Sequence, residues 1–187
     1  ALTGGPHGSA GVAAALGAAH NQAPKELATQ IRCAIARAIE HELKWLNERG
    51  DWLDRRIAND QRTAVGQSWC HGAPGALLAA VVLHRYGLNN IDKMEQWIDF
   101  AIASTLRARP SVDGLCCGTS GLLLIQEIAA KEFDMPKLKS RATTLRTLLA
   151  QKICNRQVRF SDYFPLKHHP PGLFDGYSGV AIALHLS

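Results

Sequence analysis

A short pattern, Gly-x-x-Gly, recurs four times in this chain, each time with an apolar run directly after it. The four copies, taken with the residue before the first glycine, are His7–Gly11, His71–Gly75, Cys117–Gly121 and Asp175–Gly179. Four copies in 187 residues make an internal repeat, which constrains the fold more strongly than any single local signal. Each copy also places a side chain that can bind a metal or a proton just ahead of a predicted helix.

An apolar helix is predicted after every copy, and an amphipathic helix after three of them. The apolar helices cover residues 12–19, 73–86, 119–133 and 180–186, and the amphipathic helices cover 25–49, 91–107 and 136–154. Apolar residues at helical spacing, such as Ile31, Ile35 and Ile39, give the amphipathic helices one buried face. Asn90 is placed to cap the helix that starts at Ile91. We expect the apolar helices to be buried on all sides.

The pairing of these helices predicts the architecture. No stretch shows the alternation of a strand, so the fold class is all-α. Repeated pairs of one inner and one outer helix predict an α/α toroid, in which the inner helices begin at one end. The Gly-x-x-Gly turns would then line a shared mouth, where glycine lets backbones approach closely. Four hairpins do not close a ring of six or seven, so we expect residues 1–187 to be the C-terminal part of one domain.

Composition excludes several classes of protein. With 47% hydrophobic and 20% charged residues the chain is globular, and it has no apolar run of the roughly 20 residues that span a bilayer. Five cysteines, two of them adjacent, form a poor disulfide framework, and the absence of a secretion signal favours the cytoplasm. The net charge of +5 comes partly from a basic run at 131–159. Such a run is typical of a solvated helix face; the alternative is a docking surface for an acidic partner. Nucleic acid is not an expected partner, because no groove-reading motif or aromatic interleaving is present.

Three cysteines at the repeat turns are candidate zinc ligands. Cys70, Cys116 and Cys117 lie at predicted helix N-termini, where the helix dipole favours the thiolate form that binds metal. Catalytic zinc sites use three protein ligands and keep the fourth position open. The alternative is that these residues are buried structural thiols. We retain that second interpretation for Cys33 and Cys154, which lie in the amphipathic helices.

Histidines and one aspartate complete the candidate site. His7 and His71 occupy equivalent positions in the first two copies, and imidazole exchanges protons near neutral pH. Their alternative is a structural role, with the ring bonded to a backbone carbonyl. Asp175 is interpreted as a helix cap. His168 and His169 lie in a predicted long loop. They are interpreted as a lid element, as an additional ligand, or as residues without a role.

The chain resembles the lanthionine synthetase C-like cyclases, and more closely the cyclase end of the fused class II lanthipeptide synthetases. The resemblance runs from end to end and is carried by four motifs: His7-Gly-x-x-Gly, Trp69-Cys70-His71-Gly-x-x-Gly, Leu115-Cys116-Cys117-Gly-x-x-Gly and Gly172-Leu-Phe-Asp-Gly-Tyr-Ser-Gly-Val180. In the common family pattern a histidine stands where this chain has Cys117. The third motif therefore resembles the prochlorosin-type subgroup with three cysteine ligands.

The resemblance implies a zinc-dependent cyclase with an α/α-toroid fold. Its reaction adds a peptide cysteine thiol to dehydroalanine or dehydrobutyrine in the same precursor peptide, closing a lanthionine or methyllanthionine ring. It implies zinc ligation by Cys70, Cys116 and Cys117, acid/base roles for His7 and His71, and two partners. These are the dehydrated precursor peptide and an N-terminal remainder of the synthetase with the rest of the ring and a dehydratase domain.

Two features of the family are not found, and two other functions stay open. An arginine that some members have four residues before the zinc cysteine is Gly66 here, and an acidic residue of an earlier repeat would precede Ala1. The fragment alone is therefore expected to have reduced activity or none. The alternatives are glutathione addition to dehydrated proteins and a non-catalytic, zinc-containing module that binds peptides.

Overall fold

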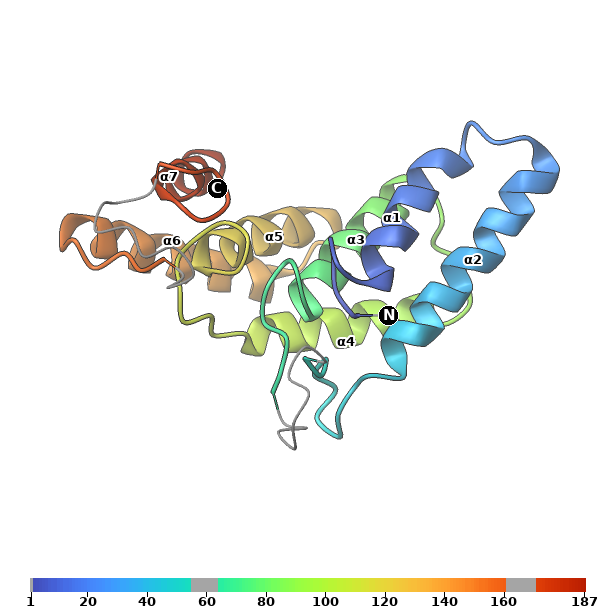
Figure 1. The fold of residues 1–187 in the computed structure, drawn as a ribbon, viewed down its shortest axis with the longest axis horizontal. Helices are drawn as coiled ribbons and strands as arrows, with labels where there is room; N and C mark the ends of the chain where they lie inside the picture. Colours follow the sequence, from blue (N-terminus) through green and yellow to red (C-terminus); the bar gives the residue numbers. More distant parts are fainter. Residues whose placement is uncertain (1, 55–63, 161–170) are drawn as a thin grey trace. The chain divides into compact units, whose positions relative to one another are not determined.

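The structure, a computed structural model, describes residues 2–54, 64–160 and 171–187 (Figure 1). Over these residues the only extended elements are isolated β-bridges, and no helix is long and apolar enough to cross a membrane. The chain divides into two compact units, Ala1–Thr105 and Leu106–Ser187, which are described separately. The helices are α1 Ser9–His20, α2 Lys25–Leu43, α3 Ala73–Arg85, α4 Met94–Arg107, α5 Thr119–Glu132, α6 Pro136–Cys154 and α7 Tyr177–Leu186.

In the first unit, α1 packs against both α2 and α3. The buried face of α2 consists of Ile31, Ile35 and Ile39, whereas Leu27 on the same helix is 47% exposed. Burial of an isoleucine side chain contributes roughly 1.5–3 kcal/mol, so this stripe holds the outer helix in place. The predicted half-exposed outer helix is therefore confirmed.

The first apolar helix is less buried than the sequence predicted. Only Ala10, Ala13 and Gly17 of α1 are buried, and Val12 is 58% exposed. The small residues let α1 approach its two neighbours on one side; Gly17, for example, lies against Leu83 of α3. Among the described residues of this unit no helix covers the opposite side of α1, so the prediction of burial all round is wrong. By contrast, α3 is buried along most of its length, as predicted.

Four predicted helix boundaries are also wrong, and two of them are the starts of α1 at Ser9 rather than residue 12 and of α7 at Tyr177 rather than residue 180. The second helix ends at Leu43 rather than Arg49, because Leu46 turns back and pairs with Trp52 in an antiparallel bridge. The fourth helix begins at Met94 rather than Ile91. Asn90 does not cap it; its side-chain oxygen accepts a hydrogen bond of 2.8 Å from the Arg32 guanidinium.

In the second unit, α5 packs against α6 and α7. A core cluster joins the three helices with the residue that follows α4; its members are Ala108, Leu122, Leu123, Ala142, Leu145 and Ala183. The end of α7 is open, since Leu186 is 67% exposed. The inner helix α5, which has helices on two sides, is buried along most of its length.

The same steric constraint explains why the last position of every repeat copy is glycine. A Cβ placed on it would fall 2.0–2.2 Å from the carbonyl oxygen of the residue six positions earlier. The four pairs are Gly11 with Gly5, Gly75 with Trp69, Gly121 with Leu115 and Gly179 with Leu173. The loop before each inner helix therefore folds back over the first turn of that helix, and any side chain would collide with backbone that cannot easily move.

Candidate active site

In the first unit the loops of copies one and two lie against each other. The N–H of Gly5 donates a hydrogen bond of 3.0 Å to the carbonyl of Trp69. A Cβ on Gly75 would lie only 2.2 Å from the Gly5 nitrogen, so the backbones are in direct contact. Helices α1 and α3 thus begin beside each other, as predicted for neighbouring inner helices.

This contact brings the two predicted histidines together. The rings of His7 and His71 stack with centroids 4.8 Å apart and an interplanar angle of 13°. His71 is buried and His7 is exposed. Cys70, the residue before His71, is only 3% exposed. One unit therefore holds a buried cysteine sulfur, a buried imidazole and an imidazole open to solvent within two adjoining turns.

A buried carboxylate fixes the first of these turns. Glu42, near the end of α2, is completely buried and accepts hydrogen bonds from the Ser9 hydroxyl (2.7 Å), the Ala10 N–H (3.0 Å) and the Gly4 N–H (3.2 Å). These donors bracket His7 in the sequence. Burial raises the pKa of Glu42 from 4.5 to about 7, although the hydrogen bonds from Ser9, Ala10 and Gly4 act in the opposite direction.

Sequence reasoning did not single out Glu42. A charged residue in an amphipathic helix is normally assigned to the solvated face, and its partners lie 32–38 residues away. One signal was present: Glu42 follows Ile39 by three residues and so continues the buried stripe of Ile31, Ile35 and Ile39. A carboxylate in line with that stripe must find donors inside the protein.

In the second unit the two adjacent cysteines stand just before α5. Their Sγ atoms are 3.5 Å apart, and both side chains are half-buried. The N–H of Cys116 donates a hydrogen bond of 3.0 Å to the carbonyl of Phe174, which precedes the fourth copy. The turns of copies three and four therefore adjoin in this unit as those of copies one and two do in the first.

An ion pair between a buried aspartate and a partly buried lysine supports the cysteine turn. Asp113 is completely buried; its carboxylate accepts bonds from Lys152 Nζ (2.7 Å), the Thr119 hydroxyl (2.9 Å) and the Arg159 N–H (2.9 Å). Thr119 is the first residue of α5 and Lys152 lies in the last turn of α6. The carboxylate thus ties the outer helix to the loop that carries Cys116 and Cys117. Sequence reasoning missed it because an aspartate in a Ser-Val-Asp-Gly loop reads as a solvated turn residue.

Comparison with known proteins assigns the family. A family model described as lanthionine synthetase C-like protein matches residues 1–186. The chain belongs to this family. No curated protein matches it in a sequence search.

The fold of this lanthionine synthetase C-like chain is similar to that of nisin cyclase. The TM-score is 0.68 at 20% sequence identity. The similarity covers 95% of this chain and 44% of the nisin cyclase chain, so the chain spans less than half the length of that protein. The likeness confirms the predicted all-α fold class and its α/α-toroid architecture for this portion.

The structure also corrects two predictions about individual residues. Asp175 is not a helix cap, because Gly176 occupies the cap position of α7 and no side chain bonds there. Cys33 and Cys154, predicted as buried structural thiols, are exposed on α2 and α6. The pair His168 and His169 lies outside the described residues.

The departure at Gly66 from the pattern of some family members has a local cause. A Cβ at this position would lie 2.7 Å from the carbonyl oxygen of His71 and 2.8 Å from the Cα of Gly72. An arginine therefore cannot occupy this position without moving the backbone of the second repeat turn. In this chain the loop before Cys70 packs more closely than an arginine would allow.

Proposed function

We propose that this chain is part of a zinc-dependent cyclase of the class II lanthipeptide synthetases. It would add a peptide cysteine thiol to dehydroalanine or dehydrobutyrine and so form lanthionine and methyllanthionine rings. The observation that carries this proposal is the pair of cysteine sulfur atoms, 3.5 Å apart at the N-terminus of α5, in a chain of this family. The same chemistry places the reaction among carbon–sulfur lyases.

The donor chemistry fits zinc. With Zn–S distances of about 2.3 Å and tetrahedral angles, two thiolates on one ion lie about 3.8 Å apart. The Sγ atoms of Cys116 and Cys117 are 3.5 Å apart. We propose Cys70 as the third ligand. Zinc held by three thiolates would leave one position for the substrate thiol and favour its ionised form.

The residues of the first unit would handle the proton. Addition of a thiolate to the dehydro residue leaves negative charge on the acceptor, and a proton must then reach its α-carbon. His7 is exposed and stacked on the buried ring of His71. We propose that the His7 ring delivers this proton and that His71 orients the His7 ring, while Glu42 keeps the His7 turn closed through the Ser9 hydroxyl and two N–H groups.

The partners follow from this chemistry. The substrate would be a precursor peptide whose serines and threonines have been dehydrated, in the cytoplasm, by a dehydratase domain of the same synthetase. The N-terminal remainder of the synthetase would complete the ring. The exposed face of α1 around Val12 supports such packing, because an inner helix of a toroid lies between two other inner helices, and among the described residues α1 packs against one, α3.

The test uses the chain with and without the remainder of the synthetase. Cyclisation leaves the peptide mass unchanged, so unreacted thiols are alkylated and counted by mass spectrometry. We expect about one zinc per chain by elemental analysis, as for a single three-ligand site. Cys70→Ala and Cys116→Ala should lose both zinc and cyclisation.

The chain supplies matched controls. Cys33→Ala and Cys154→Ala remove exposed thiols on outer helices and should retain both properties. Equal loss in all four variants, or full zinc with no consumption of peptide thiol, would contradict the proposal. A parallel assay with glutathione and a dehydrated protein separates intramolecular cyclisation from glutathione addition.

A further inference from the structure

The excess charge of the chain lies entirely in the second unit. The first unit has ten basic and ten acidic side chains, whereas the second has eleven basic and six acidic ones. Solvation alone does not require the excess basic residues to be concentrated in one unit. The second unit therefore carries the positive electrostatic potential that would favour an anionic ligand.

A pocket in this unit gathers part of the charge. Its volume is about 530 Å³ and its lining consists of Ser111, Lys152, Arg156, Gln157, Val158 and Arg159. Three of the six residues are cationic and none is acidic. Arg156 and Arg159 are exposed, and neither guanidinium has a hydrogen-bond or ion-pair partner within residues 106–160 and 171–187.

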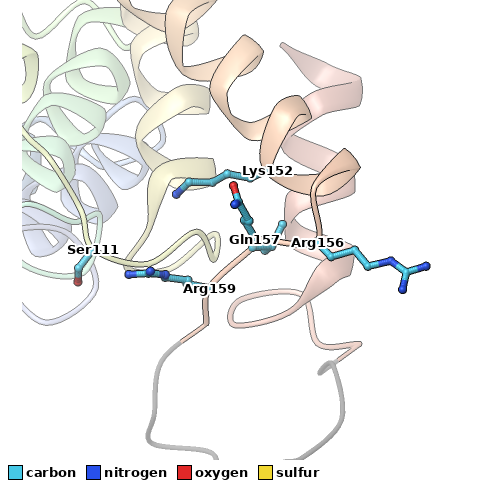
Figure 2. A pocket seen from close by; sticks show the side chains of 6 residues that line it. Ser111, Lys152, Arg156, Gln157 and Arg159 are labelled. Atoms are coloured by element: carbon cyan, nitrogen blue, oxygen red, sulfur yellow. The ribbon is translucent and has the colours of Figure 1, made fainter.

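The pocket adjoins the ion pair between Asp113 and Lys152. The Asp113 carboxylate accepts a hydrogen bond of 2.7 Å from Lys152 Nζ and another from the Arg159 backbone N–H. These bonds fix the Lys152 ammonium group and the backbone of Arg159. Lys152 uses one of its three N–H donors on Asp113. Figure 2 shows Lys152 and Arg159 reaching toward the side where Ser111 lies, whereas Arg156 points to the other side.

The local charge remains positive after the opposing groups are counted. Asp113 contributes one negative charge, and the C-terminus of α6 contributes about half of one. Lys152, Arg156 and Arg159 contribute three positive charges. The remaining charge of about +1.5 favours an anion, and the divergent directions of Arg156 and Arg159 favour an extended ligand with more than one acidic group over a single small anion.

We propose that this pocket binds an acidic segment of the peptide substrate. Carboxylates of an extended segment would contact Arg159 and Lys152 on one side and Arg156 on the other. The Ser111–Cys117 loop runs from the pocket to Cys116 and Cys117, so a peptide anchored here has its reacting portion tethered to the same unit. None of the six described lining residues has an aromatic side chain on which bases could stack, which favours a peptide over single-stranded nucleic acid. The peptide's role as substrate rests on the proposed cyclase function, whereas the binding site does not.

The experiment measures binding by fluorescence anisotropy at low salt with the 187-residue chain. The probe is a short labelled peptide of alternating Glu and Gly, without Cys or dehydro residues, and its counterpart has Gln for Glu. We expect the Glu peptide alone to bind. Arg156→Gln combined with Arg159→Gln should weaken it about 5-fold, the sum expected for two exposed ion pairs.

The matched control is Lys137→Gln combined with Lys139→Gln. It removes the same charge from exposed residues at the other end of α6, about 25 Å away along the helix. We expect no change in binding. Circular dichroism verifies that both double variants are folded.

Several results would overturn the proposal. They are equal weakening by both double variants, no preference for Glu over Gln, displacement of the peptide by inorganic phosphate at low concentration, and tighter binding of a single-stranded oligonucleotide through the same arginines. The probe carries no reacting group, so its binding is independent of cyclisation. Loss of cyclisation with intact, variant-sensitive peptide binding would refute the cyclase function alone.

Discussion

Glu42 makes the stability of the first unit depend on pH in a direction opposite to that of most carboxylates. Its pKa rises from 4.5 to about 7 because the buried carboxylate loses its hydration. One pKa unit corresponds to about 1.4 kcal/mol, so the shift is worth about 3 kcal/mol. Between these two values the folded chain keeps a proton that the unfolded chain has released. The free energy of unfolding therefore falls as pH rises, and the contribution is lost above about 7.

Replacing Glu42 by Gln should remove this dependence. An amide stays neutral at every pH, and its oxygen can still accept the bonds from Ser9 and Ala10. Urea unfolding followed by far-UV circular dichroism should show that the wild-type chain loses about 3 kcal/mol between pH 5 and 8 relative to Glu42→Gln. At pH 5 the two chains should have similar stability.

A control residue lies two positions away on the same helix. Glu40 is 47% exposed and pairs with Lys44 at 3.4 Å across the surface. Glu40→Gln removes the same charge without any change in burial, so its pH dependence should follow that of the wild type. The reasoning fails if Glu42→Gln and Glu40→Gln give parallel curves, because Glu42 would then be ionised and hydrated like a surface residue.

Two further substitutions probe the second unit. Lys152→Met should lower the free energy of unfolding in urea by about 2–3 kcal/mol, because it leaves the fully buried Asp113 without its cation. Lys139→Met, at an exposed site of the same helix, should be nearly neutral. Equal effects of the two substitutions would show that the ion pair does not support the fold. Cys117→His lowers the negative charge at the proposed zinc site by one, so cyclisation should become several-fold slower and the ring pattern more uniform. Mass spectrometry measures both the rate and the ring pattern. If neither changes, the proposed role of the third thiolate is refuted.

The helices were predictable because their signals are local. Glycines, prolines and the apolar spacing placed α3, α5 and α6 within a residue of their observed ends. The errors occurred where a distant contact decides the outcome. Leu46 continues the apolar spacing of α2 but pairs with Trp52, and Asn90 is a good cap by composition but bonds to Arg32. Such competition between local preference and tertiary contact leaves no mark in a single sequence.

The candidate site likewise contains residues that the sequence predicted and residues that it did not. The repeat register identified His7 and His71, and these two residues do stack. The residues that hold their turns and those of the cysteines, Glu42 and Asp113, were not predicted. The sequence does not distinguish a solvent-exposed carboxylate from a buried one. Only the positions of the hydrogen-bond donors around it, which are set by the fold, distinguish the two cases. Ligands that recur with the repeat are therefore readable from sequence, whereas the groups that orient them are not.

The repeat glycines allow a direct test of this view, because α1 contains two glycines in different surroundings. A Cβ on Gly11 would lie 2.2 Å from the Gly5 carbonyl oxygen, which is held by the bond from Gly8 N–H, while a Cβ on Gly17 would lie 2.5 Å from the end of the Leu83 side chain. Alanine is favoured over glycine in a helix by about 1 kcal/mol at either position. A side-chain terminus can rotate away but a bonded backbone cannot, so Gly17→Ala should change stability by less than about 1 kcal/mol and Gly11→Ala should cost about 2–3 kcal/mol. Urea unfolding measures both. Equal stability of the two variants would mean that the loop before α1 yields easily, and the close approach would then not explain why the pattern ends in glycine.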